Sequence, residues 1–382
     1  MRRIRKFILM ILAAVMVSFF GADISAEDIS AEEISSMAED YGIGEISQEL
    51  PSEAAEFLEE KGISPDDPQS VMSLSPALVL EYMWEKVRDN AAEPLRIFAA
   101  VTALVVMAAA VGAVSDISDS GSSEQLCRII TVLAAAAAVI PTVSRCVDNA
   151  AADMESGSDF MLCYVPVFAS VAAAAGNAAA SLGYNAVVLL VAEAAVRVAA
   201  DVIMPVISIC IAMSIINAVN PAFSLGSLTS LMRKWISLLL GFIMTIFTGL
   251  LSVQSIVGAS ADTLGVKAAK FMVSNLVPVV GSAVADAYTT MRSGLGLLRG
   301  AAGAFGIIAA AVILLPPILE SGLMYLAMSA GEALAEMMGI KELAVFFKGT
   351  ASALSLLIAV IACFAVMFII STIILMSAVS AG

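Results

Sequence analysis

The chain has 382 residues, of which 60% are hydrophobic and only 14% charged, with a net charge of −15. Soluble domains are about 45–50% apolar and about 25% charged, so this composition excludes an ordinary soluble protein and indicates one whose apolar surface meets lipid. There is no histidine, the commonest general base and metal ligand, and no cluster of Lys and Arg suited to nucleic acid. We therefore expect no enzyme activity, no cofactor, no metal site and no nucleic-acid partner.

Residues 1–22 are the first predicted element. Four basic residues precede an apolar run from Phe7 to Phe20, which is the pattern of a secretory signal peptide. Phe20 stands where a cleavage site favours a small residue, so an uncleaved N-terminal anchor is the alternative. In both cases the basic end stays in the cytoplasm and the segment that follows is exported.

Residues 23–94 form an acidic region with few bases. It begins with a short DISAE repeat, which we expect to be partly disordered. Two short amphipathic helices are predicted after it, one beginning at Ser52 and ended by Gly62 and Pro65, and one opened by Ser75 and Pro76. Three roles are open for this exported region: contact with a partner, contact with the membrane surface, or a solvated linker.

Residues 95–382 form the predicted membrane domain, since a helix needs about 20 mostly apolar residues to span a bilayer. The sequence therefore predicts an all-α, polytopic protein with about seven or eight membrane segments. These are Leu95–Ser115, Leu126–Ser144, Phe160–Ala180, Asn185–Val219, Trp235–Val257, Phe271–Thr290, Ala301–Ser329 and Ala351–Ala378. Runs of Ala and Gly at 134–138 and 172–176 indicate helices that pack closely on one another or on another subunit.

A row of ionisable residues marks the first candidate site. Glu193, Arg197 and Asp201 recur every four residues, so a helix places them on one stripe. Pro205 removes the helical partner of the Asp201 carbonyl. Charged side chains beside a broken helix are typical of a transporter's midplane site. The alternatives are a structural ion cluster, or a turn over 195–202 between two shorter segments.

Two further patterns concern the segments that contain proline. The residues around Pro166 and Pro205 resemble those around Pro278 and Pro316 at an offset of 111–112 residues. A duplication with three segments in each copy predicts two inverted repeats, whereas chance similarity in a biased sequence is the alternative. The stretch from Lys267 to Arg292 is amphipathic and predicts a crossing, a re-entrant hairpin or an interfacial helix. Its candidate pore or structural residues are Asn275, Pro278, Gly281 and Asp286.

The basic residues give conflicting signals about topology. Arg233 and Lys234 predict a cytoplasmic loop before Trp235, and Arg292 and Arg299 predict another before Ala301. Two crossings lie between these loops, and two more would end the chain inside. Counting back through plain spans places 23–94 inside as well, against the signal segment. We therefore expect Asn185–Val219 and Phe271–Thr290 to be broken or re-entrant.

The stretch from Lys270 to Ala287 carries a resemblance to a known family. Its sequence SNLVPVVG at 274–281 and its Asp286–Ala287 pair, together with Asn220–Pro221 and Pro316–Pro317, resemble the stage III sporulation protein AE family of endospore-forming bacteria. The resemblance covers roughly residues 40–380. It adds no catalytic residue.

The resemblance implies a membrane-embedded subunit of a channel or secretion-like complex that links the mother cell and the forespore and is needed for late forespore development. The implied partners are the other stage III A operon proteins, including an ATPase and ring components, and the forespore-side stage II protein Q. It also implies a multi-pass protein of the mother-cell membrane around the forespore, and we expect an oligomer. The alternative is a stand-alone secondary transporter with its site around Glu193, Arg197 and Asp201.

Overall fold

The computed structural model describes residues 31–65, 67, 70–71, 76–115, 121–220, 225–276 and 281–377. Every regular element in these ranges is a helix. Five stretches of described helix are long and apolar enough to cross a membrane, which confirms the predicted all-α, polytopic fold. The predicted signal segment, residues 1–22, lies outside the described residues.

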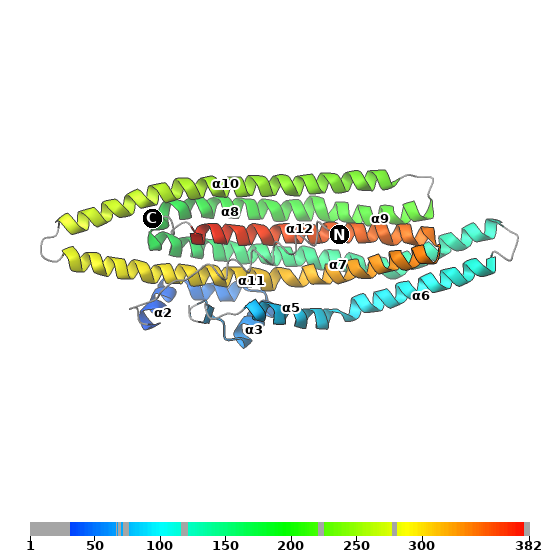
Figure 1. Cartoon of the computed structure of the whole chain (residues 1–382), viewed down its shortest axis with the longest axis horizontal. Helices are drawn as coiled ribbons and strands as arrows, with labels where there is room; N and C mark the ends of the chain where they lie inside the picture. Colours follow the sequence, from blue (N-terminus) through cyan, green and yellow to red (C-terminus); the bar gives the residue numbers. More distant parts are fainter. Residues whose placement is uncertain are drawn as a thin grey trace.

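The long helices lie side by side along one axis and alternate in direction (Figure 1). In chain order they are α6 (Ala92–Ser115), α7 (Gly121–Ala172), the run of α8 (Ala178–Val198), η3 (Ala199–Ile203) and α9 (Met204–Val219), then α10 (Leu225–Leu276), α11 (Gly281–Met337) and α12 (Lys341–Ser377). α11 and α12 are central, with 72% and 83% of their most apolar windows buried, whereas α10 is peripheral with 17%. The 57 residues of α11 extend about 86 Å, more than twice a bilayer's hydrocarbon core.

The first correction concerns α7. Leu126–Ser144 and Phe160–Ala180 were predicted as separate segments, but the described chain is one helix from Gly121 to Ala172. The polar residues between the two segments do not stop the helix, and one of them, Arg145, pairs with Glu93 of α6.

The chain instead turns at the π-helical element η2 (Ala173–Asn177), where Gly176 has φ 100°. Glycine adopts this left-handed conformation without a steric penalty. The rings of Phe168 and Tyr184 lie 6.1 Å apart, which shows that α8 folds back along α7. The turn between these two passes therefore lies at residue 176 and not between residues 145 and 159.

Asn185–Val219 is a continuous helical run in the structure and does not double back. Its break is the π-helical turn η3, where the Met204 N–H donates to the Ala199 carbonyl. Pro205 follows at the start of α9. A π turn adds one residue to the turn and lets the helix continue past a proline that cannot donate to the Asp201 carbonyl. The sequence located this break correctly, but the expected reversal is absent.

Phe271–Thr290 is not one segment either. α10 ends at Leu276 and α11 begins at Gly281, and the chain reverses between them at one end of the bundle (Figure 1). Of the three interpretations of this stretch, a hairpin fits best. The expected inverted repeat does not appear in the described helices, because the helices that contain Pro205 and Pro316 run in the same direction with the single pass α10 between them (Figure 1).

The acidic region packs against the bundle as a layer, which we call the docked layer. It comprises α2 (Ala31–Asp40), η1 (Ile43–Glu49), α3 (Ser52–Glu60) and α5 (Pro76–Asn90), and it lies along α7 and α11 (Figure 1). Its apolar side chains belong to the same core as the long helices, among them Ile43, Ile46, Phe57 and Leu58. The two predicted amphipathic helices are confirmed as α3 and α5, and the solvated-linker alternative does not hold for this layer.

Small residues let the long helices approach closely, as the Ala and Gly content predicted. A Cβ atom on Gly258 of α10 would overlap the backbone of Ala180 in α8, and one on Gly349 of α12 would overlap Ser214 of α9. A Cβ on Gly306 of α11 would overlap the ring of Tyr164 in α7. Each of these close helix contacts is possible because glycine has no side chain.

Candidate functional site

The charged row predicted from the sequence lies on the outside of the bundle. Arg197 Nε donates to Glu193 Oε1 at 2.6 Å, and the two side chains are 74% and 44% exposed. Asp201, in the π turn, is also exposed. The described helices therefore do not enclose the row, as a midplane transport site would require.

The residues of the second predicted group lie elsewhere. Asn275 is in the last turn of α10, Gly281 begins α11 and Asp286 follows in its second turn, so the three lie at the hairpin end of the bundle. Pro278 lies outside the described residues. Pro205 is exposed at the start of α9, beside the charged row. The structure thus brings the second group together at one end but does not join it to the row.

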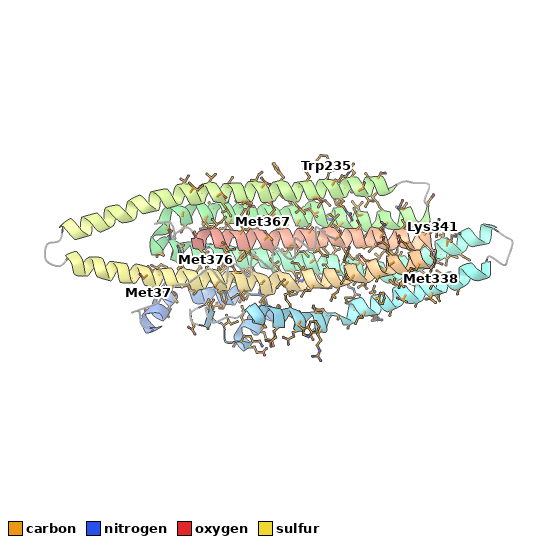
Figure 2. The ribbon with its side chains drawn as sticks, viewed as in Figure 1. Met37, Trp235, Met338, Lys341, Met367 and Met376 are labelled. Carbon is orange, nitrogen blue, oxygen red and sulfur yellow. The ribbon has the colours of Figure 1, made fainter. Side chains whose placement is uncertain are left out.

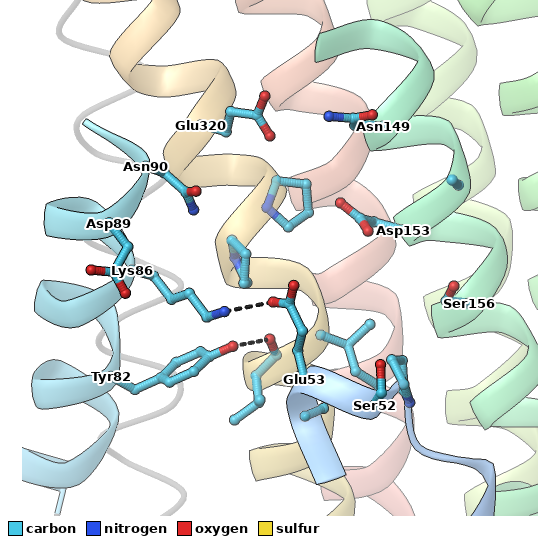
Figure 3. Close-up of a pocket in the computed structure, with 17 residues that line it drawn as sticks. Ser52, Glu53, Tyr82, Lys86, Asp89, Asn90, Asn149, Asp153, Ser156 and Glu320 are labelled. Atoms are coloured by element: carbon cyan, nitrogen blue, oxygen red, sulfur yellow. Dashed lines mark hydrogen bonds and ion pairs between the residues drawn. The ribbon is translucent and has the colours of Figure 1, made fainter. Parts of the chain in front are cut away.

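The described chain has a polar cavity that the sequence did not point to (Figure 3). Its volume is about 470 Å³, and it lies where α3 and α5 of the docked layer meet α7 and α11. Its polar lining side chains are Ser52, Glu53, Tyr82, Lys86, Asp89, Asn90, Asn149, Asp153, Ser156 and Glu320. Lys86 is the only base among these lining residues, so the cavity is acidic.

Two adjacent prolines in α11 create one wall of this cavity. Pro316 and Pro317 have no N–H, so the carbonyls of Val312 and Ile313 lose their helical partners four residues on. The hydroxyl of Tyr82 donates to the Val312 carbonyl at 3.1 Å in a buried contact. Buried carbonyls need such partners, so this bond ties α5 to α11. Burial, reinforced by the nearby Glu53, raises the pKa of Tyr82 and keeps its hydroxyl a donor.

Side-chain contacts join α3 to α5 beside this bond. The rings of Phe57 and Tyr82 lie 4.3 Å apart, and Lys86 pairs with Glu53 across the cavity (Figure 3). Lys61 pairs with Glu81 at 3.5 Å on the outer side. The two helices therefore dock as one unit, with Tyr82 as their polar contact with the bundle.

Polar side chains of α7 and α11 also line the cavity on the side of the bundle. The amide of Asn149 points toward the carboxylate of Glu320, and the Asp153 carboxylate lies one turn along α7 (Figure 3). Among residues with described side chains, no three of the His, Cys, Asp and Glu type are grouped to hold a metal ion. The arrangement suits a hydrated seam between the docked layer and the bundle.

Comparison with known proteins identifies the family. The sequence profile of the stage III sporulation protein AE family matches residues 68–379, so the chain belongs to that family. Stage III sporulation protein AE of Bacillus subtilis (strain 168) is 27% identical over 154 residues, which cover 40% of this chain and 39% of that protein. No solved structure matches the chain. The family confirms the resemblance found in the sequence.

Proposed function

We propose that this member of the stage III sporulation protein AE family is a membrane-embedded subunit of a channel or secretion-like complex that links the mother cell and the forespore. In this role it is needed for late forespore development and resides in the mother-cell membrane around the forespore. The observation that carries the proposal is the family match, which spans α5 and all of the long helices. Several helices apolar enough to span a membrane support it.

The docked layer supports a role in assembly. It exposes acidic side chains of α3 and α5, including Glu56, Glu59 and Glu85, and also Trp84, which is 73% exposed. An acidic surface with an exposed aromatic residue suits a partner with a basic surface. The partners proposed for it are the ring components and ATPase of the stage III A operon and the forespore-side stage II protein Q.

The geometry does not favour the stand-alone transporter. A transport site needs ionisable groups that face a bundle interior or a water-filled cavity, whereas Arg197 is 74% exposed on the outer surface. The acidic cavity beside Pro316 lies between the docked layer and the bundle. It is therefore part of the contact between two regions of this chain. We propose a structural and conductive subunit and no enzyme activity.

The proposal is tested by capturing the tagged protein from sporulating cells at its native level. We expect the other stage III A operon products to be recovered with it. A variant with both Glu56→Lys and Glu59→Lys should recover less of these operon products at equal abundance. The control is a variant substituted at Leu326, an exposed apolar residue of α11. Recovery of none of these proteins with the abundant native protein would refute the proposal.

A further inference from the structure

The seam between the docked layer and the bundle has acidic side chains on both of its sides. On the layer side, Glu53 of α3 and Asp89 of α5 line the cavity. On the bundle side, Asp153 of α7 and Glu320 of α11 line it (Figure 3). Lys86 is the one base among the lining residues, and it pairs with Glu53. The remaining charge is negative on both sides, so the two surfaces repel each other when these carboxyls are ionised.

The charged groups around the seam do not offset this repulsion. Asp153 faces the carboxyls of Glu53 and Glu320. Glu93 of α6 also acts on Glu320, and its own charge is balanced by its pair with Arg145 of α7. Among the described residues, no base forms an ion pair with either carboxyl of the bundle side. The two bundle carboxyls are therefore opposed by acids from α3 and α6 and lack a countercharge.

The contact between α5 and the rest of the chain combines a hinge with a hydrogen bond. A single residue in a turn, Ala91, separates α5 from α6. α6 itself is held on the bundle, because a Cβ on Gly331 of α11 would overlap Val101 of α6. Beyond the hinge, the hydroxyl of Tyr82 holds α5 to the Val312 carbonyl. α3 and α5 lie on the flank of the bundle, and side chains on their outer side point away from it (Figure 2).

We propose that α3 and α5 form a strap that closes on α7 and α11 as the pH falls and loosens as the pH rises. In the closed strap the carboxyls of Glu53, Asp153 and Glu320 face one another, and like charges resist ionising together. The closed state therefore binds protons more tightly than the open state, so lower pH stabilises closure. Phe57 and Leu58 of α3 are buried, which keeps the strap mostly closed, and the titration changes a minor open population.

The first experiment measures opening by limited proteolysis of the full chain in lipid nanodiscs at pH 5 and at pH 8. The cleavage rate between residues 60 and 92 is divided by that of a synthetic peptide of the same residues at the same pH. This division removes the pH dependence of the protease. When opening is fast relative to cleavage, the ratio follows the open population, and we expect it to be at least about fivefold higher at pH 8. An equal or lower ratio at pH 8 overturns the proposal.

The second experiment identifies the carboxyls that respond. Asp153→Asn combined with Glu320→Gln keeps the size of both side chains and removes their charge, so the ratio at pH 8 should fall to the value at pH 5. Glu155→Gln is the matched control, because it removes an exposed acid of the same helix that does not line the cavity. This control should keep the native response. A double variant that keeps the response, or a control that loses it, overturns the proposal.

The third experiment changes the charge of the seam in the opposite direction. Ser156 of α7 lines the cavity, so Ser156→Asp adds a carboxyl to it, and Ser156→Asn has the same size without the charge. We expect Ser156→Asp to raise the ratio at pH 8 at least about threefold above Ser156→Asn, because one more like charge opposes closure, with a smaller effect at pH 5. A general loss of stability would raise the ratio equally at both values. An equal effect at pH 5 and pH 8 therefore overturns the strap.

Discussion

The bundle has two contrasting faces. On one, α7 and α11 are covered by the docked layer, whose Phe57 and Leu58 are buried and whose Tyr82 reaches a carbonyl of α11. On the other, α10 exposes an uninterrupted apolar row from Leu228 to Val257. Both faces are apolar helix surfaces, yet among the described residues only the first has a cover formed by the chain itself.

The difference comes from where proline interrupts the helices. Pro316 and Pro317 expose two carbonyls in α11, so its cover must include a hydrogen-bond donor, which Tyr82 supplies. α10 has no proline among its 52 residues, and its exposed side chains include the large apolar row from Leu228 to Val257.

The largest contrast should come from removing one phenylalanine from each face. Phe57 is 7% exposed in the docked layer, so Phe57→Ala should destabilise that layer by about 3–5 kcal/mol. Phe242 is 60% exposed on α10, so Phe242→Ala should change the stability of the monomer by no more than about 0.5 kcal/mol. Amide hydrogen exchange of the diluted protein in detergent measures the stability change caused by each of the two substitutions. Equal effects would show that the two faces do not differ as described.

A second contrast tests the interior that both faces share. Gly306→Val places methyl groups against the ring of Tyr164, so we expect about 1–3 kcal/mol of destabilisation. Gly322→Val in the same helix is the control, because a Cβ there meets no atom within 4 Å. Thermal unfolding in detergent should separate the two variants. Similar melting temperatures would contradict the close contact of α7 and α11.

The third prediction concerns the hydrogen bond beneath the docked layer. Tyr82→Phe leaves the buried Val312 carbonyl without its partner, which costs about 1–3 kcal/mol. The layer should then open more often, and limited proteolysis between residues 60 and 92 should be faster. Trp84→Phe, on the exposed side of the same helix, should leave the cleavage rate unchanged. Unchanged cleavage in Tyr82→Phe would mean that apolar packing alone holds α5.

The sequence predicted the fold class and both helices, α3 and α5, that line the cavity, because amphipathic spacing and apolar length are local signals. The sequence prediction is wrong at residues 145–159, where polar residues indicate a break between two segments, whereas α7 continues there and Arg145 pairs with Glu93 of α6. The sequence located the η3 break from Pro205. It did not predict that Arg197 faces outward, because the side of a helix that faces outward depends on which helices pack against it. The cavity was missed for the same reason, since Tyr82 and Val312 are 230 residues apart.

The smallest expected effect distinguishes the ion pairs from the hydrogen bond. Lys86→Gln removes the pair with Glu53, and Lys61→Gln removes the pair with Glu81. Because both carboxylates are largely exposed, each change should cost less than about 1 kcal/mol, and both effects should shrink further at high salt. Proteolysis of the layer measures this on the same scale as Tyr82→Phe. If Lys86→Gln opened the layer as much as Tyr82→Phe, the ion pair and not the proline-freed carbonyl would fix the covered face.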